Sequence, residues 1–192
     1  MALWIPDQAP IHRVGGHVAL DFANTVSWRG TSRQVDHIDG VPALMRWARD
    51  AGLIGDMAAM PEDQDAFLAQ AHRLRSAVRG TFEAVVAGTA ASGDRAVLLD
   101  IARSCLASAE LSGAPAELRY ARTEDTILGA IAWGAIALLG SARIGRVKIC
   151  EPDNCRWLFL DTTKNGSRRW CDMGACGNRA KAAQHRTRLK SD

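Results

Sequence analysis

Four of the five cysteines fall in two pairs near the carboxyl end of the chain. The pairs are Cys150-x4-Cys155 and Cys171-x4-Cys176, with 15 residues between them. Each pair can sit on a tight loop that aims two thiolates at one point, and the intervening segment can bring the loops together. Such a set predicts a tetrahedral zinc site, with an iron–sulfur cluster as the chemical competitor. Because four thiolates leave no open position for a substrate, we predict a structural and not a catalytic metal.

The remaining chemistry in the sequence is sparse. Cys105 falls on the apolar face of a predicted helix, and we interpret it as a small core residue. The chain contains no Gly-x-Ser-x-Gly elbow, no phosphate-cradling glycine loop and no His-Glu-x-x-His motif. We therefore predict that the protein is not an enzyme.

The charge of the chain is distributed unevenly. Residues 1–142 hold 12 basic and 16 acidic side chains, a net charge of −4, whereas residues 143–192 hold 12 basic and 5 acidic, a net charge of +7. A basic segment attached to an acidic body is typical of binding to a polyanion, and a solubilising tail is the alternative.

The basic residues that surround the cysteines are the candidates for phosphate contacts. Two lie just before Cys171, and the others fall on a predicted final helix from Met173 to about Leu189. A solvated basic helix is the alternative reading of this segment. The predicted nucleic-acid-binding residues are Arg168, Arg169, Arg179, Lys181, Arg186, Arg188 and Lys190.

Helical periodicity dominates the rest of the sequence. Between Phe67 and Val85 apolar residues recur every three or four positions, which predicts one continuous helical stripe. A later segment is apolar nearly all round and predicts the buried centre of the helical body. The predicted helices are residues 17–25, 42–50, 62–88, 94–110 and 124–139, with a short strand at 117–121.

The segment around the cysteines has a different character. Residues 147–149 and 157–160 predict two strands, and Asn165-Gly166 predicts a hairpin turn that returns the chain along residues 168–170. We therefore predict a mainly α protein with two separately packed parts. An all-α helical domain spans residues 1–143, and a small treble-clef-like zinc finger, a β-hairpin plus a C-terminal helix, spans residues 144–192.

Two further features bear on function. His17, Asp21 and Asn24 follow the Gly15-Gly16 pair and could line a ligand pocket, although a capped helix start explains them equally well. The longest apolar run, Ile127–Leu139, has 13 residues, fewer than the ~18–20 of a membrane-spanning helix. The amino-terminal sequence has no secretory-signal pattern, so we expect a cytoplasmic protein.

The sequence also resembles a known family. The run Cys150–Asp161 and the run Asn165–Lys181, which contains Cys176-Gly-Asn-Arg, resemble the CGNR zinc finger, whose name comes from that last motif. The segment Gly15–Thr25 is similar to the opening of the helical ABATE domain that precedes this finger. The resemblance implies a bacterial, stress-related transcription regulator with the four cysteines as zinc ligands. Arg168, Arg169, Arg179 and Lys181 match its basic positions.

Double-stranded DNA is therefore the expected partner, and the helical domain is expected to sense a small-molecule effector or to form a homodimer. A zinc-stabilised adaptor that binds protein and not DNA remains the alternative. Asn178 and Arg179 have a competing role at the metal. Asn178 could hydrogen-bond the thiolate loop, and Arg179 could offset the −2 charge of a Zn(Cys)4 centre.

Overall fold

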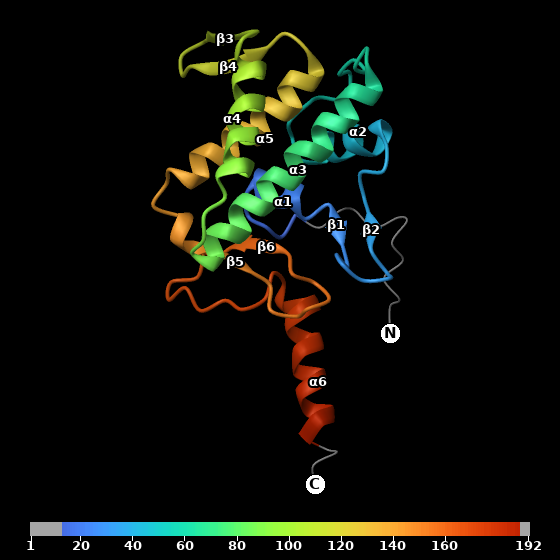
Figure 1. Cartoon of the computed structure of the whole chain (residues 1–192), viewed down its shortest axis with the longest axis vertical. Coiled ribbons are helices and arrows are strands. Elements are labelled where there is room, and N and C mark those ends of the chain that lie inside the picture. Colours follow the sequence, from blue (N-terminus) through green and yellow to red (C-terminus); the bar gives the residue numbers. More distant parts are fainter. Residues whose placement is uncertain (1–12, 189–192) are drawn as a thin grey trace.

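Three long helices form the body of the protein. The computed structural model describes residues 13–188, with side chains through residue 183. Helices α3 (Gln64–Ala87), α4 (Ser92–Leu106) and α5 (Thr123–Leu139) pack together, as Figure 1 shows. The short helix α1 (Val18–Ala23) packs against α3 and α5, and α2 (Val41–Asp50) packs against α3.

Local sequence signals set the ends of these helices. The carboxylate of Asp63 accepts a hydrogen bond from the backbone N–H of Ala66 at 2.9 Å and so caps the start of α3. Gly88 ends that helix in the left-handed conformation, with φ at 68°, as glycine commonly does. Pro42 lies in the first turn of α2, where its missing N–H costs nothing.

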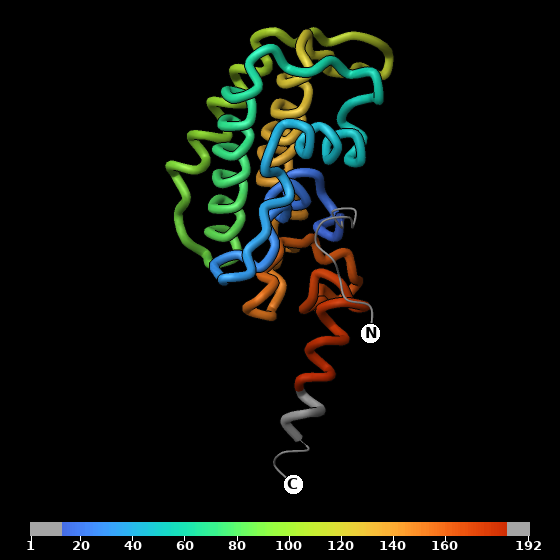
Figure 2. The backbone as a smooth tube through the Cα atoms, turned by 90° about the vertical axis from the view of Figure 1, so that its right-hand side faces the viewer, coloured from blue at the N-terminus to red at the C-terminus, as the bar shows by residue number. Residues whose placement is uncertain are grey.

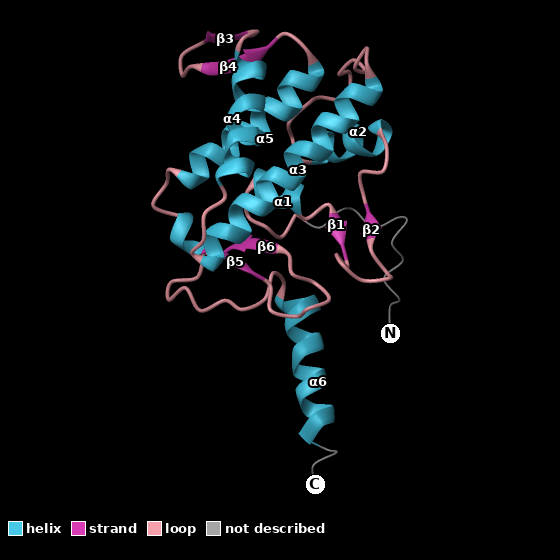
Figure 3. Ribbon diagram, in the orientation of Figure 1, coloured by secondary structure: helices cyan, strands magenta, loops and turns pink. Residues whose placement is uncertain are grey.

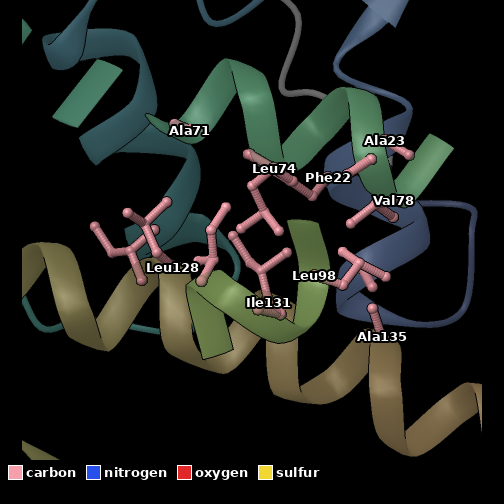
Figure 4. Close-up of a cluster of buried hydrophobic side chains, with 14 of the residues drawn as sticks. Phe22, Ala23, Ala71, Leu74, Val78, Leu98, Leu128, Ile131 and Ala135 are labelled. Atoms are coloured by element: carbon pink, nitrogen blue, oxygen red, sulfur yellow. The ribbon is translucent and has the colours of Figure 1, made fainter. Parts of the chain in front are cut away.

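The apolar stripes of the helices meet in one core. Figure 4 shows side chains from α1, α3, α4 and α5 converging, among them Phe22, Leu74, Leu98 and Ile131. Each fully buried side chain of this size contributes about 1.5–3 kcal/mol relative to an exposed one. Trp133, however, is 47% exposed, so α5 shows one face to solvent and is not buried all round.

Within residues 13–188, three two-stranded antiparallel hairpins complete the fold (Figure 3). The strands β1 (Val26–Ser27) and β2 (Val35–Asp36) pair, and Arg75 of α3 holds this hairpin through Asp36, with one nitrogen–oxygen distance of 2.6 Å. Strands β3 (Ala109–Ser112) and β4 (Glu117–Tyr120) pair at the end of the body opposite α6. The third pair is β5 (Val147–Ile149) with β6 (Leu158–Leu160).

The structure confirms the mainly α class and corrects the prediction in detail. The helical part is not all-α, because it contains the hairpins β1–β2 and β3–β4. Helix α4 ends at Leu106, not near Glu110, and the chain then enters β3.

The prediction of a hairpin at Asn165-Gly166 is wrong. Strand β6 pairs with β5, and no strand forms at residues 168–170. The reason lies in the Asp161 side chain, which accepts hydrogen bonds from the backbone N–H groups of Thr163 and Arg168. Because both N–H groups donate to the same carboxylate, the segment between Thr163 and Arg168 forms a closed loop. Its backbone does not pair with a strand.

The prediction of two separate cores is also wrong. Val147, Leu158 and Leu160 of β5 and β6 belong to the same buried cluster as the side chains of α1, α3 and α5. A second, smaller cluster gathers around the cysteines and includes Phe159. The metal-binding segment therefore rests directly on the helical body.

The last helix has a different setting. After a π-helical turn, Met173–Gly177, helix α6 (Asn178–Arg188) projects away from the rest of the molecule (Figures 1 and 2). The chain is buried at Cys176 in the π-helical turn, whereas Ala183 on α6 is exposed, so the helix leaves the metal module soon after it begins. Among the described helices, none is long and apolar enough to cross a membrane.

Candidate metal centre and its basic surroundings

Two loops carry the four cysteines. The first leaves β5 at Cys150 and turns back at Cys155, whose backbone N–H donates to the carbonyl of Pro152 at 2.8 Å. The loop closes where the N–H of Cys150 donates to the carbonyl of Trp157, also at 2.8 Å. The second loop runs from Cys171 to Cys176, and its turn is capped by Asp172.

The sulfur atoms come together as the spacing predicts. All four lie within 4.8 Å of one another, and the Sγ of Cys171 is 3.6 Å from those of Cys155 and Cys176. Zinc–sulfur bonds of about 2.3 Å in a tetrahedron place neighbouring sulfurs about 3.8 Å apart, so the cluster fits a zinc ion. The distances are far longer than the ~2.05 Å of a disulfide, and the cysteines are free thiols.

Hydrogen-bond donors point at the sulfurs. The backbone N–H of Cys171 donates to the Sγ of Cys150 at 3.3 Å, and the guanidinium of Arg179 donates to the Sγ of Cys176 at 2.9 Å. Contacts with the other three thiols and the charge of Arg179 lower the pKa of Cys176. These donors offset the negative charge that four thiolates concentrate around one metal ion.

Cys105 contrasts with these four residues. It is 1% exposed within the helical core, and burial raises the pKa of its thiol to about 12. A thiol of this kind is protonated and inert at neutral pH, which agrees with the interpretation of Cys105 as a core residue.

Polar contacts join the metal module to the helical body. The buried side chain of Asn24, at the end of α1, donates to the carbonyl of Leu158 at 2.8 Å and accepts from its N–H at 2.9 Å. The backbone N–H of Leu160 donates to the carbonyl of Gly15, and the indole of Trp157 donates to the carbonyl of Val26. Strand β6 is thereby fixed to the segment that surrounds α1.

His17, Asp21 and Asn24, the residues of the predicted ligand pocket, each make a structural hydrogen bond. His17 caps α1 by accepting from the N–H of Ala19, and Asp21 accepts from the N–H of Gly15 at 2.8 Å. Asn24 donates to the carbonyl of Leu158 and accepts from its N–H. The three side chains close a turn and join two elements, which corresponds to the structural alternative.

Two of the predicted nucleic-acid contacts, Arg168 and Arg179, make contacts within the metal module. The guanidinium of Arg168 donates to the carbonyls of Trp170 and Cys171 and lies over the ring of Phe159. Arg179 bonds a metal-site sulfur, and the amide of Asn178 donates to the carbonyl of Gly174 within the second cysteine loop. The last two residues of the Cys-Gly-Asn-Arg motif, Asn178 and Arg179, thus make contacts that order the loop.

The other basic residues are distributed as follows. Arg169 is exposed and forms an ion pair with Glu151, and Lys181 is exposed on α6. Arg186 and Arg188 belong to α6 by their backbone, and Lys190 lies outside the described residues.

Two cavities in the structure were not predicted from the sequence. One, of about 230 Å³, adjoins the metal site and is walled partly by Trp28 and Trp157. The other, of about 250 Å³, lies between Arg143, Arg146 and Lys164. The first cavity is walled by residues from segments far apart along the chain, and the second by the turn at Arg143 and Arg146 together with residues 160–164, so its walls come together only in the folded chain. The excess of positive charge beyond residue 142 was the one signal available for the second.

The comparisons with known proteins agree with this architecture. Residues 146–189 match the model of the CGNR zinc finger, and residues 16–142 match that of the ABATE domain, described as "Putative stress-induced transcription regulator". No curated protein matches the chain. Neither description is that of an enzyme. Because the ABATE match alone covers more than half of the 192 residues, the chain belongs to the ABATE family and carries a CGNR zinc finger at its carboxyl end.

Proposed function

We propose that the protein is a DNA-binding transcription regulator in which a structural Zn(Cys)4 finger presents a basic surface to duplex DNA. In this proposal residues 1–143 form the regulatory body and residues 144–192 the DNA-binding part. The observation that carries it is the charge split, −4 for residues 1–142 against +7 for residues 143–192. Phosphate contacts by Lys and Arg supply most sequence-independent affinity for DNA.

Helix α6 gives this charge a suitable form. It contains Arg179, Lys181, Arg186 and Arg188 and no acidic residue, and it projects from the body (Figure 2). The major groove of B-DNA admits a helix of this kind. Zinc ties the second cysteine loop, from which the helix starts, to the first, and Arg168 and Arg179 help to hold the second loop. The predicted phosphate contacts therefore narrow to Arg169, Lys181, Arg186, Arg188 and Lys190.

A salt-titrated binding assay tests this function. For four or five phosphate contacts, the logarithm of the association constant of zinc-loaded protein for a labelled duplex should fall with the logarithm of salt concentration with a slope of about −4. Lys181→Gln should make that slope less negative by about one unit, because one phosphate contact is lost. Arg119→Gln, on β4 at the far end of the body, removes the same charge and should leave the slope unchanged.

The assay also separates the proposal from its main competitor. Absence of duplex binding at low salt, by protein that carries one zinc per chain, would refute the regulator. The basic finger would then be better explained as a surface for an acidic protein partner.

A further inference from the structure

The second cavity has the composition of an anion site. It lies between the 3-10 turn Ile144–Arg146 and the loop that follows β6, and the metal-binding cysteines do not line it. Three cationic side chains and two threonines line a volume of about 250 Å³, and the hydroxyl of one of these threonines, Thr163, already donates to Asp161. The lining residues are Arg143, Arg146, Leu160, Asp161, Thr162, Thr163 and Lys164.

The loop that forms one wall is held in a fixed shape. Asp161, at the end of β6, has a fully buried side chain and accepts from the N–H of Thr163 at 3.0 Å, from its hydroxyl at 2.6 Å, and from the N–H of Arg168 at 2.8 Å. Lys148 completes the arrangement as an ion pair with Asp161 at 2.8 Å and also donates to the carbonyls of Gly166 and Arg168. The backbone around the two threonines is therefore ordered before any ligand arrives.

Arg146 is positioned by the same loop. Its Nη1 donates to the carbonyl of Thr163 at 3.0 Å. The guanidinium passes over Gly166, where a Cβ atom would lie 2.7 Å from Nη1, and the φ of 59° at that position also favours glycine. Gly166 thus leaves space for the guanidinium of Arg146, and the carbonyl of Thr163 orients it.

The charges favour a polyanionic group. The carboxylate of Asp161 is the acidic member of the lining, and Lys148 neutralises it. Arg143, Arg146 and Lys164 then leave a local charge of +3, and all three side chains are exposed to an incoming ligand. A single carboxylate needs one arginine, whereas a phosphate offers several oxygens to guanidinium, ammonium and hydroxyl donors.

We propose that this cavity binds a phosphate group. The favoured source is the backbone of duplex DNA, because the cavity is built from the basic segment 143–192 and adjoins β6, which lies at the end of the body from which α6 projects (Figure 1). That assignment rests on the proposed function, whereas binding of a phosphate group does not. A free phosphate ester is the other source of the same chemistry.

The test uses the zinc-loaded full chain and the double variant Arg143→Gln/Lys164→Gln. Arg146 is retained because its removal would release the carbonyl of Thr163. In the first arm, inorganic phosphate is titrated while backbone amides are followed by NMR. Saturable shifts should be confined to Thr162, Thr163 and Lys164 in the wild type and absent in the variant.

In the second arm, the salt dependence of duplex binding is measured. The variant should make the slope less negative by about one unit, since the contact with the one phosphate group in the cavity is lost. The matched control Arg46→Gln/Arg119→Gln removes two exposed arginines of α2 and β4 and should bind as the wild type does. One zinc per chain and an unchanged melting temperature establish that each variant is folded.

The two arms separate the possible results. A phosphate response that the variant abolishes, together with the change in slope, supports the backbone of DNA as the ligand. The same phosphate response with an unchanged slope, or with no DNA binding at all, supports a free phosphate ester and in the latter case refutes only the proposed function. If the double variant alters neither the phosphate response nor the slope, the phosphate site is refuted.

Discussion

At the scale of the residue, side chains that seemed available for ligands are engaged in holding the fold. Arg168 and Arg179 bond carbonyls and a sulfur of the metal module, and Asn178 bonds the second cysteine loop. Asp21 is 7% exposed and is held by a single backbone N–H, that of Gly15. A buried carboxylate with so little compensation carries a cost when it ionises.

Because of this cost, we expect ionisation of Asp21 to make the stability of the fold depend on pH. Burial raises the pKa of Asp21 from 3.8 to about 6, against the opposing effects of the Gly15 N–H and Arg13. Because the folded pKa lies above the unfolded one, Asp21 stabilises the fold less as the pH rises through 6. Asp21→Asn keeps an acceptor for the N–H of Gly15. The difference between its free energy of unfolding and that of the wild type should shift in favour of the variant by about 1 kcal/mol as the pH rises from about 5 to about 7.

Urea unfolding of both proteins at the two pH values measures this gain. The comparison cancels the pH dependence of zinc binding and of the histidines, which both proteins share. Parallel stability curves would show that Asp21 is already ionised in the folded protein at the lower pH.

At the scale of the element, the junction between α1 and β6 decides how the two parts of the chain fit together. Strand β6 is three residues long, and the side chains of its first and last residues, Leu158 and Leu160, lie in the helical core. Its backbone is satisfied on one edge by β5 and on the other by Asn24 and Gly15. One amide side chain thus takes the place of a neighbouring strand.

Removal of that amide should be costly. Asn24→Ala leaves both the N–H and the C=O of Leu158 buried without their partner, and each unsatisfied group costs about 1–3 kcal/mol. We expect a loss of about 2–5 kcal/mol in the free energy of unfolding. Asn178→Ala, which removes one exposed hydrogen bond to Gly174, is the matched control and should cost less than about 1.5 kcal/mol. Equal losses in chemical denaturation would contradict a bridging role for Asn24.

At the scale of the whole molecule, the metal module and the helices form one structure. Strands β5 and β6 contribute to the main core, and the cysteine cluster packs on their other side through Phe159. The energy of zinc binding, of order 10–16 kcal/mol in small fingers, therefore supports the layer on which the helices rest.

Zinc removal tests this coupling. Chelation, or Cys171→Ser, should lower the midpoint of the thermal transition of the helices themselves, followed by far-ultraviolet circular dichroism. Elemental analysis should give one zinc per chain before treatment. Helices that melt at an unchanged temperature after the zinc is lost would instead show that the two parts fold independently.

Cys105→Ala, a core substitution away from the metal, should lower stability without releasing zinc.

The sequence by itself determined the features that depend on local spacing. These are the metal ligands, the helical stripes and their caps, and the excess of positive charge beyond residue 142, since each can be read within a few turns or one pair of loops. Tertiary structure alone decided which strand pairs with β6, because the Asp161 side chain competes with the ladder for backbone donors. It alone decided that β5 and β6 join the helical core, and that Arg143, Arg146 and Lys164 face one cavity. Burial and the convergence of distant loops are properties of the packed chain, and no local pattern of residues encodes them.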